Sequence, residues 1–184
     1  MDNLILGGGG GYTFMADRRG KVGGSVNEPY QFDTAGAILE KGKAKGIELV
    51  LAQDALIAED FSEHANTRQA PSNDIPDGWE GVDIGEEAKR SFSEVVLSAK
   101  TILWNGPVGV FEIDKFATGT RAVADAIVEA TAHGAYSLVG GGDSVAAVNK
   151  FGLADKVSYV STGGGALLEY MEGIELPGVA AIRK

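Results

Sequence analysis

Three clusters of consecutive glycines, each after a short apolar run, constrain the fold of this chain more than any other feature. The clusters occupy residues 7–11, 140–142 and 163–165. Each pattern predicts a strand, then bare backbone, then a helix. In an open α/β sheet such strand ends line one crevice, where free N–H groups and helix N-termini attract phosphate. The pattern therefore predicts a nucleotide ligand.

Strand and helix patterns alternate along the rest of the chain. Helical periodicity lies at residues 31–45, 86–98 and 116–132, and β-rich runs lie at 47–51, 101–104, 136–139 and 157–161. Further helices are expected to begin near Ser144 and Gly165. Residues 55–61 are expected to be extended, and the polar stretch at 62–85 is expected to be mostly connection. The alternation predicts a single α/β domain over residues 1–184, a three-layer α/β/α Rossmann-like fold with a mostly parallel sheet.

Composition limits the class of partner. The 184 residues include 16 basic and 26 acidic side chains, which gives a net charge of −10. No basic run is longer than Arg18-Arg19, so binding to nucleic acid or to a membrane surface through bulk charge is not expected. An anionic ligand must then be held locally, by backbone dipoles and a metal ion. The chain has no cysteine, secretory signal or long apolar span, so a cytoplasmic location is the default expectation.

The second glycine cluster continues into Asp143, Ser144 and an apolar helical run. The first free N–H groups of that helix can hold an anion. A carboxylate beside phosphates is reasonable if Asp143 binds Mg²⁺, which takes one or two carboxylates together with phosphate oxygens. Capping of the helix by Asp143 explains the residue equally well. The local pattern leaves both roles open.

The remaining motifs also allow two interpretations. Residues 163–165 open a helix, so two helix N-termini can share a polyphosphate, although glycine also permits tight packing. Residues 7–11 let a base or a phosphate approach the backbone, and a flexible turn explains them nearly as well. Asn105 and Glu112 can reach a ribose, whereas a loop glutamate is ordinarily just a solvated carboxylate.

Two common nucleotide-binding fingerprints do not occur in the chain. Neither G-x-G-x-x-G nor G-x-x-x-x-G-K-[ST] is found. Their absence disfavours a dinucleotide-binding oxidoreductase and a Walker-type ATPase. A third alternative is a non-binding scaffold whose glycines serve only packing. His64 and His133 lie in polar or helix-end contexts and are expected at the surface.

Three segments together resemble the C-terminal, nucleotide-binding domain of the phosphoglycerate kinase family. They are LWNGPVGVFE at residues 103–112, GGGDS at 140–144 and VSTGGGA at 160–166. Further matches at residues 2–9, 12–14, 75–79, 83–85 and 176–179 extend the resemblance over nearly the whole chain. The resemblance implies phosphoryl transfer between 1,3-bisphosphoglycerate and MgADP, giving 3-phosphoglycerate and MgATP in glycolysis. It also implies Mg²⁺ with ADP or ATP as cofactor and an N-terminal phosphoglycerate-binding domain as partner.

Residue roles are implied by the same resemblance. The adenine pocket would be lined by Gly8, Gly9, Gly81 and Val110. Asn105 and Pro107 would lie close to the nucleotide, and Glu112 would hold its ribose. The phosphates and Mg²⁺ would be bound by Gly141, Gly142, Asp143 and Ser144, with Asp143 as the metal ligand. The transferring phosphoryl group would receive N–H groups from Gly163, Gly164 and Gly165, because this reaction needs positioning and charge stabilisation rather than a covalent partner.

The sequence departs from the family pattern in several places. A glycine-alanine-lysine segment with phosphate-binding lysines is expected before Met1 and is absent from these residues, as is the N-terminal domain. Gly10 and Gly11 stand where the family has a larger residue and a small one, and residues 22–34 fit only partly. The isolated chain is therefore expected to bind nucleotide without turnover.

Overall fold

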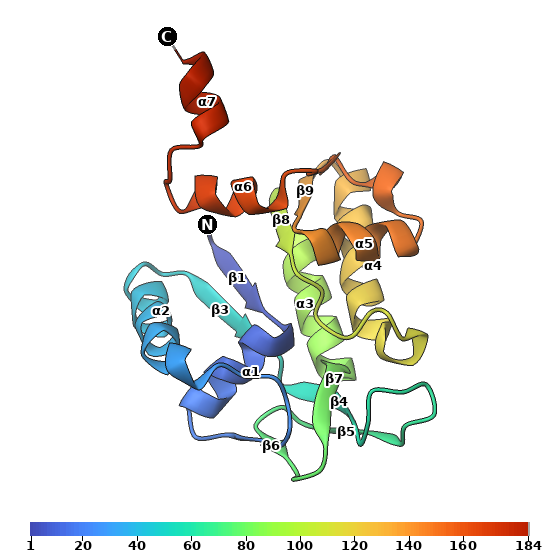
Figure 1. Ribbon diagram of the computed structural model, residues 1–184. Helices are drawn as coiled ribbons and strands as arrows, with labels where there is room; N and C mark the ends of the chain where they lie inside the picture. The colour runs from blue at the N-terminus through green and yellow to red at the C-terminus, as the bar shows by residue number, and fades with distance from the viewer. Residues whose placement is uncertain (184) are drawn as a thin grey trace.

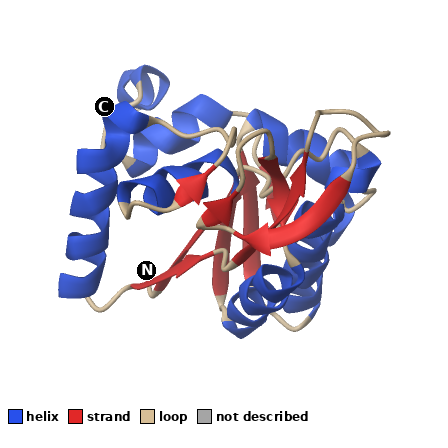
Figure 2. Ribbon diagram, turned by 90° about the horizontal axis from the view of Figure 1, so that it is seen from below, coloured by secondary structure: helices blue, strands red, loops and turns tan. Residues whose placement is uncertain are grey.

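The computed structural model describes residues 1–183 and has the layered α/β/α arrangement that the sequence predicts. Figure 2 shows the strands as a central layer with helices on either side. In Figure 1 the pair α1 and α2 lies to one side of these strands and the pair α3 and α4 to the other. His64 and His133 are exposed, as predicted.

The central strands are parallel. β1 (Asn3–Leu6) pairs with β3 (Glu48–Leu51), and a second group has the order β10-β9-β8, with β8 at Thr101–Asn105, β9 at Tyr136–Gly140 and β10 at Tyr159–Val160. Each glycine cluster follows the carboxyl end of one of these strands. The last strand is shorter than the expected run at 157–161, and η3 (Ala154–Lys156) precedes it.

Helices α1 to α6 begin close to the positions that the glycine clusters and apolar periodicity predict, whereas α7 was not predicted. Their bounds are Gly8–Asp17 for α1, Phe32–Ala44 for α2, Glu86–Ser98 for α3, Thr118–Ala132 for α4, Gly142–Lys150 for α5, Gly164–Met171 for α6 and Pro177–Ile182 for α7, with short 3-10 turns η1 (Pro29–Gln31) and η2 (Asp114–Phe116). Ala88, Phe92 and Val96, spaced four residues apart, are the buried residues of α3. Their spacing places them on one face of the helix.

The expectation that residues 62–85 are mostly connection is wrong. They contain β5 (Thr67–Pro71), β6 (Asp74–Ile75) and β7 (Glu80–Ile84). β4 (Asp54–Ala58) pairs antiparallel with β5 and β7, and β6 pairs with β2 (Lys21–Val22). The local pattern missed these strands because they are short and polar, and their stability comes from pairing with distant segments.

The largest core cluster lies between α3, α4 and the strands β8 and β9. Phe92, Ile127, Val139 and Val148 are fully buried within it. A buried side chain of this size is worth about 1.5–3 kcal/mol relative to leaving it exposed. This core holds the carboxyl ends of β8 and β9, and hence two of the loops discussed below, in fixed positions.

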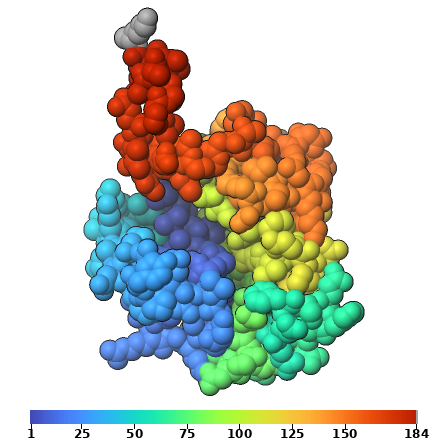
Figure 3. Space-filling view, in the orientation of Figure 1, coloured from blue at the N-terminus to red at the C-terminus, as the bar shows by residue number. Residues whose placement is uncertain are grey.

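The last two helices, α6 and α7, form a C-terminal arm and contain no buried residue. α6 begins against the end of β9, where the Leu167 side chain fills the space beside Gly140, and only α7 projects away from the body of the protein (Figures 1 and 3). Tyr170, Met171 and Ile174 are exposed on this arm by 63%, 59% and 49%. Within residues 1–183, no helix has both the length and the apolar character needed to cross a membrane.

Candidate nucleotide-binding site

The start of α5 exposes backbone donors at the end of β9. Its first turn is closed by the hydrogen bond from the Val145 amide to the Gly141 carbonyl, at 3.0 Å. The amides of Gly142, Asp143 and Ser144 therefore have no acceptor within the helix. Gly141 adopts φ 87° at the N-cap position, a conformation that favours glycine. The resulting cluster of free N–H groups is suited to an anion.

The start of α6 lies directly against this turn. A Cβ added to Gly164 would lie 3.2 Å from the Gly141 Cα and 3.6 Å from the Gly142 nitrogen. The fold thus brings the second and third glycine clusters together, as the sequence predicted. Gly164 serves close packing here, whereas a Cβ on Gly165 would meet nothing within 4 Å. The packing interpretation is therefore confirmed for Gly164, whereas phosphate binding by this cluster stays a prediction.

Asp143 is exposed and does not cap its helix. α5 has no side-chain capping hydrogen bond, and its N-cap residue is Gly141. The capping interpretation of Asp143 is therefore wrong. Among residues 1–183, no three histidine, cysteine, aspartate or glutamate side chains gather into a group that could hold a metal ion. A lone carboxylate beside free amides fits a Mg²⁺ ion that takes its other ligands from phosphates and water.

Two side chains join the end of β8 to the first turn of α5. The Asn105 Oδ1 atom occupies the space that a side chain on Gly141 would need. The Ser144 hydroxyl is buried and accepts a hydrogen bond from the Gly106 amide. Ser144 can therefore offer an anion its backbone amide, while its side chain fixes the neighbouring loop.

The residues expected at the adenine end also come together. Gly8, at φ 59°, lies so close to the Pro107 carbonyl that a Cβ would be 3.2 Å from its oxygen. The Val110 amide donates to the Val82 carbonyl at 2.8 Å, which sets this residue beside β7 and next to Gly81. Gly8, Gly81 and Val110 thus come from three elements far apart in the sequence.

Three residues at this end were not predicted from the sequence: Tyr12, Ser25 and Val26. The Ser25 hydroxyl accepts a 2.8 Å hydrogen bond from the Gly81 amide, and Tyr12 covers the face of Gly81 where a side chain would lie. Val26 packs beside Gly9 and is 64% exposed, an apolar surface open to a flat ring. No local pattern marked them, because their roles depend on pairing across up to 56 residues.

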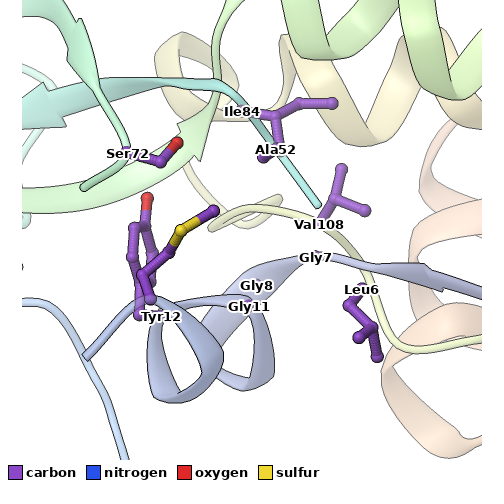
Figure 4. A pocket seen from close by; sticks show the side chains of 10 residues that line it. Leu6, Gly7, Gly8, Gly11, Tyr12, Ala52, Ser72, Ile84 and Val108 are labelled. Atoms are coloured by element: carbon purple, nitrogen blue, oxygen red, sulfur yellow. The ribbon is translucent and has the colours of Figure 1, made fainter. Parts of the chain in front are cut away.

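A small cavity lies beneath the first turn of α1. Figure 4 shows Tyr12 on its wall with the hydroxyl turned toward Ser72. The Ser72 hydroxyl is buried and has no hydrogen-bond partner among the described residues. The cavity volume of about 10 Å³ is room for a single water molecule. Burial, and secondarily the carboxylate of Asp83, raise the pKa of Tyr12 above its ordinary value, so the phenol stays protonated.

Asp83 anchors the helix behind this end of the site. Its carboxylate is 2% exposed and accepts hydrogen bonds from the amide of Gly119 and the hydroxyl of Thr118, at the start of α4. Gly109 packs against the same carboxylate where a side chain would collide with it. Burial raises the pKa of Asp83 to about 6, and this effect outweighs the hydrogen bonds and Lys89, which lower it.

Glu112 lies on the loop that links the two ends of the candidate site, the start of α5 and the residues around Gly8 and Gly81. Its side chain is exposed, whereas the preceding Phe111 is 7% exposed and belongs to the core. The structure therefore leaves the Glu112 carboxylate free to meet a ligand while the loop beneath it is anchored.

Comparison with known proteins identifies relatives over the whole chain. The family model described as phosphoglycerate kinase matches residues 1–174. The phosphoglycerate kinase of Porphyromonas gingivalis is 57% identical over 183 residues, which are 100% of this chain and 44% of that relative. Phosphoglycerate kinase 3, cytosolic, of Arabidopsis thaliana is 52% identical over 182 residues, covering 99% of this chain and 45% of that relative. The chain thus spans somewhat less than half the length of the curated relatives it matches.

Solved structures agree with these sequence matches. The phosphoglycerate kinase from Coxiella burnetii superposes with a TM-score of 0.92 at 40% identity, over 98% of this chain and 46% of that one. The enzyme from Pyrococcus horikoshii gives a TM-score of 0.80 at 27% identity, over 99% of this chain and 45% of that one.

Proposed function

Because this chain belongs to the phosphoglycerate kinase family, we propose that it forms the nucleotide-binding domain of such a kinase. The proposed reaction moves a phosphoryl group between 1,3-bisphosphoglycerate and MgADP, giving 3-phosphoglycerate and MgATP. The observation that carries the proposal is the contact of Gly164 with Gly141, which sets two glycine-rich helix starts side by side. We also propose a cytosolic location, since the Arabidopsis and Nicotiana relatives are named cytosolic.

The phosphate end is proposed to act through backbone amides. Gly141, Gly142 and Ser144 bind the nucleotide phosphates, and Gly163, Gly164 and Gly165 donate N–H groups to the phosphoryl group in transfer. Such donors stabilise charge that develops on the phosphoryl oxygens and need no reorganisation during the reaction. Asn105 supports this turn through its contact with Gly141.

Asp143 is the proposed ligand of Mg²⁺. When bound, the ion neutralises charge on the nucleotide phosphates. The exposed position of Asp143 and the absence of a capping bond leave its carboxylate available for this role.

The opposite end is proposed to hold the nucleoside. Gly8, Gly9, Gly81 and Val110 form the walls of the adenine pocket beside Pro107, and Val26 adds an apolar surface. The glycines allow a flat ring to approach the backbone closely. Glu112 is proposed to accept hydrogen bonds from the ribose hydroxyls.

The other half of the active site is proposed to lie in a separate phosphoglycerate-binding domain. The relatives are about twice as long as these 184 residues. The exposed apolar side chains of α6 and α7, which include Tyr170 and Met171, suit an arm that another part of the enzyme covers. We propose that these 184 residues alone bind nucleotide without turnover. A coupled NADH assay with ATP and 3-phosphoglycerate tests this point, and robust turnover would refute it.

Displacement of a fluorescent ADP analogue tests the nucleotide proposal itself. ADP should displace the analogue, and NAD⁺ should compete poorly because its second nucleotide has no fingerprint loop to bind. Preferential displacement by NAD⁺ would instead favour a dinucleotide-binding domain. Failure of the analogue to bind at all would favour the scaffold alternative.

A further inference from the structure

Lys150, the last residue of α5, holds the loop that carries Glu112. Its ammonium group donates to the carbonyl oxygens of Phe111 at 2.9 Å and Glu112 at 3.0 Å. It also pairs with the Asp114 carboxylate at 2.6 Å. An ammonium group has three N–H donors, so these three acceptors, all from one loop, satisfy it completely.

Apart from Lys150, the loop is fixed at this point by the packing of the Phe111 side chain in the core. Among the described residues, no backbone–backbone hydrogen bond involves Phe111 or Glu112. The Lys150 side chain is 35% exposed and Asp114 is 85% exposed, so the ion pair itself is weak. The two bonds to carbonyl oxygens are charge-assisted and act on the backbone directly. The buried Phe111 side chain and Lys150 therefore fix the Glu112 backbone together, and Lys150 is the group that bonds to its carbonyl oxygen.

The same helix carries the proposed phosphate-binding residues at its other end. Gly142 and Asp143 form its first turn, and Lys150 ends it. We propose that Lys150 is a positioning residue that sets the ribose-binding Glu112 at a fixed place relative to the phosphate-binding turn. This inference rests on the proposed nucleotide function of the site. Lys150 is assigned no contact with the nucleotide and acts only through the loop.

A double-mutant cycle tests the coupling. We expect Lys150→Met to weaken ADP binding roughly three- to tenfold, the range of one hydrogen bond, and to change tripolyphosphate binding less than about twofold. In a Glu112→Gln background the same substitution should produce almost no further loss for ADP, since its effect passes through Glu112. Lys150→Arg keeps the charge and donors and should retain most of the affinity. Lys156→Met, at an exposed lysine of the neighbouring turn, is the matched control.

Equal losses for ADP and tripolyphosphate, or additive losses in the cycle, would overturn the inference and leave Lys150 a purely structural role. Hydrogen exchange provides a measurement independent of ligand. The hydrogen-bonded amides on either side of this loop, those of Val110 and Phe116, should exchange faster in Lys150→Met than in the parent and in Lys156→Met, and unchanged exchange would overturn the inference. Failure of the parent to bind ADP, with faster exchange in Lys150→Met, would refute the proposed function while leaving the coupling of loop and helix supported.

Discussion

The amide of Gly106 donates a hydrogen bond of 2.5 Å to Oγ of Ser144, which is fully buried. This bond joins the loop after β8 to the first turn of α5. The two segments carry Asn105 and Glu112 on one side and Asp143 on the other. This buried contact thus helps to hold the loop that carries Asn105 and Glu112 against the first turn of α5.

Ser144→Ala should lower the free energy of unfolding by about 1–3 kcal/mol, because the Gly106 amide loses its acceptor in a buried setting. Urea unfolding measures this change. Ser98→Ala, at an exposed serine that bonds only within its own helix, serves as control and should have a smaller effect. Equal stability of the parent and Ser144→Ala would show that the contact contributes nothing.

Asp143→Ala should abolish the Mg²⁺ dependence of ADP binding. Its melting temperature should stay close to that of the parent, because the side chain is exposed and makes no capping bond. Calorimetry with and without Mg²⁺ measures the first effect and thermal unfolding the second. Asp33→Ala, at the same second position of α2, is the matched control. Retention of Mg²⁺-dependent binding in Asp143→Ala would place the metal elsewhere.

Glu112→Gln should weaken binding of adenosine-containing ligands by roughly 1.5–3 kcal/mol, the value of a hydrogen bond to a charged group. Tripolyphosphate, which has no ribose, should bind as it does to the parent. Competition binding with both ligands measures the difference, with Glu63→Gln at another exposed glutamate as control. A parallel loss for both ligands would exclude a specific ribose contact.

Asp83 should make the stability of the fold fall as pH rises from about 4 to 6. Burial raises its pKa from 3.8 to about 6 in the folded chain. Below about pH 3.8 the carboxyl group is protonated in both the folded and the unfolded chain, so its burial does not destabilise the folded chain. As pH rises, the unfolded chain loses this proton first, and the resulting loss of folding stability is complete above about pH 6.

Asp83→Asn removes this titration and keeps an oxygen acceptor for the Gly119 amide. The stability of the parent relative to Asp83→Asn should therefore drop by roughly 3 kcal/mol between pH 4 and 7, at 1.36 kcal/mol per pKa unit. Denaturant unfolding of both proteins across this range measures the drop, and Asp33→Asn controls for loss of an exposed carboxylate. If the stability of the parent relative to Asp83→Asn stays constant or grows with pH, burial does not disfavour the ionised Asp83 carboxylate.

The regular α/β framework could be predicted from the sequence because its signals are local. Phe92 and Val96 mark the buried face of α3, and the glycine clusters mark where strands end. The antiparallel strands around β4 could not be predicted, since residues such as Ile75 and Val82 are isolated apolar positions in polar segments. Their burial depends on pairing with distant strands, which a local pattern does not encode.

In the candidate site too, features with a local signal could be predicted from the sequence, and contacts between distant segments could not. The closeness of Gly141 and Gly164 could be predicted, because the carboxyl ends of adjacent parallel strands meet at one edge. The Ser25 contact with Gly81 could not, because a polar loop carries no periodicity. The interpretation of Asp143 as a cap failed because Gly141, at φ 87°, takes the cap position instead.

Calorimetric titration of the purified chain with ADP, in the presence and absence of Mg²⁺, tests the central claim most directly. We predict saturable binding at one site per chain, tighter with Mg²⁺ than without it. Absence of saturable binding under both conditions would contradict the assignment of this domain as the nucleotide-binding part of the kinase.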